Sequence, residues 1–322
     1  MGRLDLFVLR IPGLERLIGA APARPAELIR SLTRGRYREM TPGAALSALL
    51  RSPALPEAGP LSRLGTRAEA PPAEGSVWLR ADAVRMIPDL TAVWIDRPLT
   101  ADLCSPELEP VRRELDTMFA AEGLAWIPEP GAAHALLRLD ELPDCDFVGP
   151  LAARGGRLDE ALPTGRGALR WRRLMNESQM IFHRFRSLDR ADQHGAGLWF
   201  WGAGTGRGRA GERPELIVHG RRGDALALGL ARWLGADFSD GDAFGRGDHR
   251  RVLCRWHPEA SGSSWQRLEG DWLAPAADAL QRGRLKRLAI VGDRGTWQLG
   301  RWSRWARWRR NAAGLVDDAV QR

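Results

Sequence analysis

Lysine, cysteine, tyrosine and long apolar runs are scarce in this sequence. Its 322 residues include only three cysteines, Cys104, Cys145 and Cys254, which lie far apart and form no Cys-x-x-Cys pair. We therefore expect neither a disulfide framework nor a zinc knuckle. No segment approaches the roughly 18 apolar residues of a membrane-spanning helix, and the start of the chain meets Pro12 and Gly13 without the apolar core of a signal peptide. These absences predict a cytoplasmic protein without a transmembrane segment.

Positive charge is carried almost entirely by arginine. The 48 basic residues include one lysine, Lys286, and the formal net charge is +8. Arginine binds phosphate through a planar fork of donors, so this balance can indicate a polyanionic partner. The arginines are spread along the whole chain, however, and the codon bias of a GC-rich genome produces the same distribution. The composition leaves both explanations open.

The order of short strands and helices predicts an α/β fold with a mixed sheet flanked by helices. Residues 4–10 have the pattern of a buried strand, and residues 25–34 that of a helix beginning at a proline. A stretch rich in proline, alanine and glycine then indicates a linker, which we place at residues 67–76. It separates an expected N-terminal α/β segment, residues 1–66, from a main domain, residues 77–322.

The predicted main domain contains a long amphipathic helix and ends in a hairpin. Apolar side chains recur at helical spacing over residues 168–188, and Asn176, Gln179 and His183 follow one another on the opposite face. These three polar residues are candidate ligand-binding residues, although a solvated helix face has the same composition. A hairpin around residues 292–295 is expected near the end of the chain.

A glycine-rich run follows the strand predicted at residues 198–201. Gly202 and Gly204 would let backbone amides approach an anion, and Arg207 and Arg209 would add positive charge. Pro214 and another strand come next, whereas a dinucleotide-binding fold requires a helix at this point. The run is therefore a candidate anion-binding loop, with a plain connecting loop as the alternative.

Carboxylate and imidazole side chains gather between residues 237 and 257. Asp248, His249 and His257 are candidate metal ligands, because oxygen and imidazole nitrogen suit Mn²⁺ or Zn²⁺. The spacing matches neither the calcium-binding loop nor the His-Glu-x-x-His motif. A turn-rich loop that binds nothing is the alternative interpretation.

The segment of residues 301–310 interleaves arginine with tryptophan. Trp302, Trp305 and Trp308 would share one sector of a helix, which suits stacking on nucleic-acid bases with arginine beside the phosphates. The alternative is a terminal segment whose indole rings pack on the body of the protein while the guanidinium groups stay in water.

Several of these motifs resemble a known protein group. Residues 174–183, followed by Leu-Trp-Phe-Trp-Gly-Ala-Gly at residues 198–204, resemble the bacterial RpfE-type regulatory proteins, as do residues 78–82 and 162–165. This group is distantly similar to the archaeal-type cofactor-independent phosphoglycerate mutases of the alkaline phosphatase superfamily. The resemblance covers most of the chain from residue 78 onward and implies a degenerate phosphoglycerate mutase-like core.

The resemblance also implies what catalysis would require. Enzymes of that superfamily use two divalent metals, Mn or Zn, and a hydroxyl nucleophile, and Asp248, His249 and His257 resemble their late ligands. The first aspartate should follow strand one, but Pro12 and Gly13 stand there, and no serine or threonine nucleophile motif is evident. Losing one carboxylate removes charge from a two-metal site.

We therefore expect a non-catalytic regulatory or interaction protein without a cofactor. Its partner would be another protein or a small phosphorylated or carboxylated anion bound near the glycine run and His183. Two alternatives stay open. One is a metal-dependent phosphoglycerate mutase or phosphatase-like enzyme, and the other is a regulator that binds nucleic acid through the Arg/Trp-rich segment.

Overall fold

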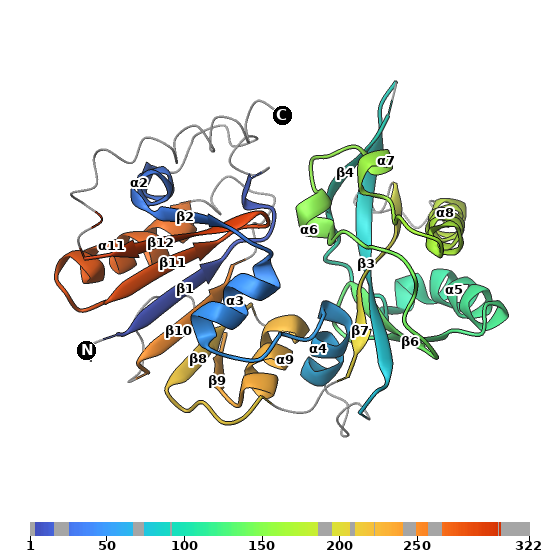
Figure 1. Cartoon of the computed structure of the whole chain (residues 1–322). Coiled ribbons are helices and arrows are strands. Elements are labelled where there is room, and N and C mark those ends of the chain that lie inside the picture. Colours follow the sequence, from blue (N-terminus) through green and yellow to red (C-terminus); the bar gives the residue numbers. More distant parts are fainter. Residues whose placement is uncertain are drawn as a thin grey trace. The chain divides into compact units, whose positions relative to one another are not determined.

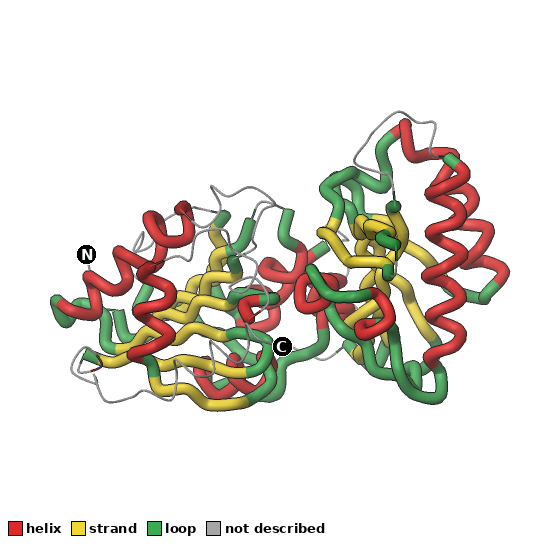
Figure 2. Tube along the Cα trace, turned by 90° about the horizontal axis from the view of Figure 1, so that it is seen from above, coloured by secondary structure: helices red, strands yellow, loops and turns green. Residues whose placement is uncertain are grey.

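The computed structural model forms two compact units, each with its own sheet (Figure 1). Unit 1 consists of residues 1–55 and 209–322, and unit 2 consists of residues 56–208. Figure 2 shows helices beside the strands in each unit. The structure describes residues 4–15, 26–66, 74–90, 92–185, 195–206, 210–221, 223–240, 249–256, 266–301 and 303.

Unit 1 contains a seven-stranded mixed sheet in the order β2-β12-β11-β1-β10-β8-β9. Neighbouring strands are parallel from β11 through β9, and β12 and β2 are antiparallel additions at the other edge. The strands are β1 (Leu6–Arg10), β2 (Arg36–Glu39), β8 (Leu216–His219), β9 (Asp237–Ser239), β10 (Arg251–Arg255), β11 (Arg287–Val291) and β12 (Gly295–Gly300). This arrangement confirms the predicted α/β class, mixed sheet and final hairpin.

Helices cover both faces of this sheet. On one face, α2 (Ala26–Arg34), the π-helical turn η3 (Leu268–Leu273) and α11 (Ala274–Gln281) enclose a core that includes Phe7 and Leu9. On the other face lie α3 (Pro42–Leu50) and α9 (Ala225–Leu234) (Figure 1). The helix that follows β8 and the helix that follows β10 therefore lie on opposite faces.

Unit 2 contains an antiparallel sheet built around one long strand, β3 (Val77–Pro88). Strand β7 (Ala196–Thr205) pairs with one edge of β3, while β6 (His134–Leu139) and β4 (Val93–Pro98) pair with successive parts of its other edge. Strand β5 (Ala125–Pro128) extends the sheet beyond β6.

The helices of unit 2 lie on both sides of this sheet (Figure 1). On one side, α5 (Glu109–Ala121) and α8 (Ala168–Arg184) pack over a core that includes Leu115, Trp171 and Phe200. The short helices α4 (Ala58–Gly65), α6 (Pro150–Ala153) and α7 (Leu158–Ala161) lie on the other side, and a 3-10 turn, η1 (Pro106–Leu108), precedes α5. Helix α8 begins at the predicted residue and ends at Arg184, four residues earlier than expected.

The boundaries of the units differ from the predicted division at residues 67–76. Helix α4 packs on β7, so the chain enters unit 2 at residue 56 rather than after residue 76. The last third of the chain returns to unit 1, because β1 lies between β10 and β11. Such pairing between distant segments leaves no local signal in the sequence.

Across the described ranges, no helix combines the length and the apolar composition needed to cross a membrane.

Candidate functional site at the carboxyl edge of the parallel strands

The topology of unit 1 marks one edge of its sheet as the place for a site. Strands β8 and β10 are adjacent and parallel, and the helices that follow them lie on opposite faces of the sheet. In open α/β sheets, ligands bind outside the carboxyl ends of strands at such a switch point. The side chains that follow β1, β8, β10 and β11 are therefore the candidates for ligand binding.

An arginine and an aspartate are paired where β1 and β11 end. Arg10 donates from Nη2 to Oδ1 of Asp293 at 2.6 Å, and from Nη1 to the carbonyl oxygens of Ile11 and Val291. The second oxygen of Asp293 accepts the backbone N–H of Gly13 at 2.6 Å. Both carboxylate oxygens of Asp293 thus already accept a donor.

A glutamate holds the turn that carries Asp293. The side chain of Glu15 accepts the backbone N–H groups of Asp293 at 3.0 Å and Arg294 at 2.9 Å. These contacts fix the hairpin loop against the segment that follows β1. With its backbone held in this way, Asp293 directs its carboxylate at Arg10 and Gly13.

A second ion pair lies at the ends of β8 and β10. Arg255 donates from Nη1 to Oδ2 of Asp224 at 2.6 Å, and these two side chains are only 11% and 8% exposed. Oδ1 of Asp224 accepts the backbone N–H of Ala227 and so caps helix α9. His219, the last residue of β8, is buried with its ring 5.2 Å from that of Trp272.

These carboxylates do not fit the two divalent metals that the family resemblance implies. Each of them has a guanidinium group 2.6 Å away, and a metal ion there would be repelled by that positive charge. The position after β1 contributes the backbone amide of Gly13 rather than a carboxylate. In the described part of the chain, no group of three or more His, Cys, Asp or Glu side chains is placed to hold a metal.

The structure describes one of the three candidate metal ligands. His249 lies before β10, and its Nε2 is 2.7 Å from Oδ2 of Asp237 at the start of β9. Strand β10 extends about 15 Å from this edge to the one where Arg255 and Asp224 are paired. Asp248 and His257 lie outside the described residues.

The candidate ligand residues of α8 do not form one polar face. Asn176 and His183 are exposed, whereas Gln179 is half-buried against the sheet. The side chain of Gln179 donates to Sδ of Met86 at 2.7 Å, and a Cβ added at Gly197 would lie 2.5 Å from its Cγ. The prediction that all three residues share one face is therefore wrong for Gln179, which packs between helix and strand.

The glycines of the candidate anion loop lie within β7 and contact α4. Gly202 has a positive φ of 66°, and a Cβ added there would lie 2.5 Å from Cβ of Ala58. A Cβ added at Gly204 would lie 2.8 Å from Cβ of Glu57. Close packing of helix on strand accounts for both glycines, and Figure 1 places α4 and α8 on opposite sides of the sheet. Arg207 and Arg209 lie outside the described residues, so their anion-binding role stays a prediction.

Two sets of arginine contacts were not predicted from the sequence. Arg213 and Arg251 donate to the carbonyl oxygens of residues 49–51, where they satisfy the carboxyl end of α3. In unit 2, Arg80 and Asp82 pair beneath Trp201. Only the alternation Arg80-Ala81-Asp82 signals that these two charges share one face of a strand.

The comparisons with known proteins find similarity at a distance only. No protein-family model matches the chain, and no curated protein matches it. Among solved structures, it is similar to the PH0037 protein from Pyrococcus horikoshii, with 13% identity and a TM-score of 0.44 over 100% of this chain and 98% of that one. It is also similar to the cofactor-independent phosphoglycerate mutase from Thermoplasma acidophilum DSM 1728, with 16% identity and a TM-score of 0.36 over 99% and 100%. These similarities assign the chain neither to a family nor to an activity.

Proposed function

We propose that this chain is a non-catalytic regulatory or interaction protein, with a small phosphorylated or carboxylated anion or a protein as its partner. The observation that carries this proposal is the pairing of carboxylates with arginines at the carboxyl edge of the parallel strands. Asp293 is held by Arg10 and Asp224 by Arg255. Carboxylates engaged in this way serve as structural groups rather than as metal ligands.

The energetic cost of recruiting these carboxylates supports the same proposal. Separating a buried ion pair leaves an uncompensated charge and costs about 3–5 kcal/mol. Asp224 would also give up its cap on α9, worth about 1 kcal/mol. A metal ion would have to offset both costs while lying beside a guanidinium group. The resemblance of residues 174–183 and 198–204 to RpfE-type regulatory proteins favours the regulatory class.

The test is to measure metal content and turnover together. The full chain is incubated with excess Mn²⁺ or Zn²⁺ and dialysed, its metal content is measured, and it is then assayed against a panel of phosphate monoesters. We expect well under one metal ion per chain and no hydrolysis or transfer above the metal-only background. About two ions per chain, with turnover lost in either Asp293→Asn or His249→Ala, would overturn the proposal in favour of the phosphomutase or phosphatase alternative.

A further inference from the structure

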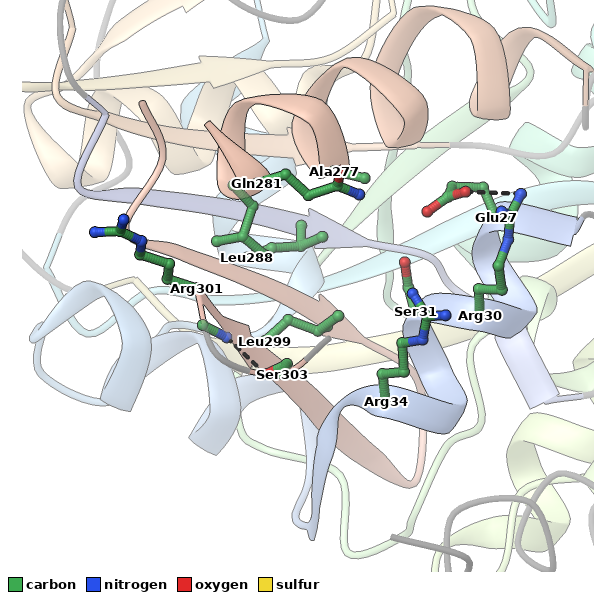
Figure 3. Close-up of a pocket in the computed structure, with 12 residues that line it drawn as sticks. Glu27, Arg30, Ser31, Arg34, Ala277, Gln281, Leu288, Leu299, Arg301 and Ser303 are labelled. Carbon is green, nitrogen blue, oxygen red and sulfur yellow. Dashed lines mark hydrogen bonds and ion pairs between the residues drawn. The ribbon is translucent and has the colours of Figure 1, made fainter. Parts of the chain in front are cut away.

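A small hollow lies between α2 and α11 in unit 1 (Figure 3). Its floor includes Leu288 at the start of β11 and Leu299 near the end of β12, so it lies at the amino edge of the parallel strands. Asp293 and Asp224 lie at the other edge. The hollow measures about 40 Å³, which is room for about three water-sized groups.

Arginine side chains line this hollow. Arg30 and Arg34 lie one turn apart on α2, and Arg301 follows β12. Glu27 offsets part of the charge through an ion pair with Arg30 at 2.9 Å. Among the described residues that line the hollow, three arginines and one glutamate give a formal charge of +2. Arg34 is exposed and forms no ion pair with any residue that the structure describes.

A serine hydroxyl group points into the same space. Ser31 lies between Arg30 and Arg34 in sequence, is only 3% exposed, and directs its side-chain oxygen into the hollow (Figure 3). Within the described ranges this hydroxyl forms no hydrogen bond. Because this hydroxyl faces the open hollow, water or a ligand oxygen can reach it, and an anionic ligand there would also meet the positive charge of the arginines.

We propose that the hollow binds the phosphate group of a small molecule. Ser31 donates to one phosphate oxygen, and Arg34 and Arg301 donate from the rim. A phosphate presents oxygens in several directions and suits donors from both α2 and the end of β12, whereas one arginine fork satisfies a planar carboxylate. This site rests on the proposed function in giving its phosphorylated partner a place, but it lies at the other edge of the sheet and does not depend on the absence of catalysis.

Calorimetric titration of the full chain with inorganic phosphate tests the proposal. Ser31→Ala removes one hydroxyl that has no structural partner, and we expect it to weaken phosphate binding about fivefold. Arg34→Gln should weaken binding about tenfold or more. Arg38→Gln is the matched control, since Arg38 is an exposed arginine of β2 outside the hollow, and it should leave the affinity unchanged.

Other results would overturn the assignment. Absence of phosphate binding, or equal weakening in Arg34→Gln and Arg38→Gln, would show that no specific site exists. If acetate bound more tightly than phosphate, the ligand of the hollow would be a carboxylate rather than a phosphate. A single-stranded oligonucleotide that binds more tightly than phosphate, with the same loss in Ser31→Ala and Arg34→Gln, would replace the small molecule with nucleic acid.

Discussion

Arg80 donates two hydrogen bonds to Asp82, from Nε to Oδ2 and from Nη2 to Oδ1, each 2.8 Å long. The two residues are two positions apart on β3, so both side chains lie on one face of the strand. Arg80 also donates to the hydroxyl of Ser62 at 2.8 Å, and the indole N–H of Trp201 donates to Asp82. The side chains of Arg80 and Asp82 are 13% and 10% exposed. The pair is therefore part of the interior of unit 2.

Removing the negative charge of this pair is expected to destabilise unit 2 strongly. Asp82→Asn keeps the size of the side chain but removes the negative charge that is paired with the buried Arg80 guanidinium, at a cost of about 3–5 kcal/mol. Urea denaturation measures this loss. The control is Asp159→Asn, since Asp159 also pairs with an arginine two residues away through two hydrogen bonds, but in water. A small effect at both positions would contradict the prediction.

Acid should weaken unit 2 through the same carboxylate. Burial opposes ionisation of Asp82, but the charge and hydrogen bonds of Arg80, with His134 and Trp201, outweigh it, so its pKa lies below the ordinary value. The resulting stability is complete above the unfolded pKa of about 3.9 and is lost as the pH falls through the lower folded pKa. Urea denaturation from pH 7 to pH 2.5 should show this loss in the wild type. An equally steep decline in Asp82→Asn would show that other groups cause it.

Gly202 is expected to tolerate no side chain. Alanine would have to adopt the left-handed backbone conformation of Gly202, at a cost of about 1–2 kcal/mol. Its Cβ would also clash with the nearby Cβ of Ala58. The matched control is Gly75→Ala, because Gly75 also has a positive φ but has no atom within 4 Å of an added Cβ. Thermal unfolding should show a larger loss for Gly202→Ala. Equal losses would mean that contact with α4 contributes nothing.

The two roles of Asp224 can be separated by substitution. Asp224→Asn keeps a side-chain oxygen able to cap α9 but loses the charge opposite Arg255. Asp224→Ala loses both, and we expect it to be about 1 kcal/mol less stable than the asparagine variant. Chemical denaturation of both variants beside the wild type gives the two contributions. Identical stabilities would show that the cap is not formed.

The cysteines should react slowly in the folded protein. Burial, with the charges of Asp146 and Asp144, raises the pKa of Cys145 to about 11. At pH 8 its thiolate fraction is then about 0.1%, against about a quarter for a free thiol. Burial also raises the pKa of Cys254, and of Cys104 together with the charge of Asp102. Ellman titration should show slow labelling that becomes fast in urea, and rapid labelling of a folded thiol at pH 8 would contradict this.

The sequence predicts local elements well and their assembly poorly. Strand β1, the hairpin of β11 and β12, and the amphipathic helix α8 all follow from apolar periodicity and turn residues. The division into units does not, because β1 takes its partners from residues 251–255 and 287–291. Such pairings depend on which edges meet in three dimensions.

The candidate sites show the same limit. Glycines in a row suggest an anion loop, but Gly202 and Gly204 provide the close approach of α4 to β7. An aspartate missing after β1 is visible in the sequence, whereas Asp293 reaches that place from the hairpin, 280 residues away from Gly13. Ser31 belongs to no motif, and only the three-dimensional structure shows that its hydroxyl faces a hollow lined by arginines.

The position of β1 in its sheet determines when this strand can find its partners during synthesis. Strand β1 precedes β10 and β11 in the chain, yet these two strands are its hydrogen-bonding neighbours. Both edges of β1 are therefore paired only after residue 291 has been synthesised. The strands of unit 2 pair only with one another, between residues 77 and 205. Their sheet can therefore form before β10, β11 and β12 have been synthesised. During that interval the apolar side chains of residues 6–9 lack their cover, and exposed apolar surface of this kind favours aggregation until it is buried.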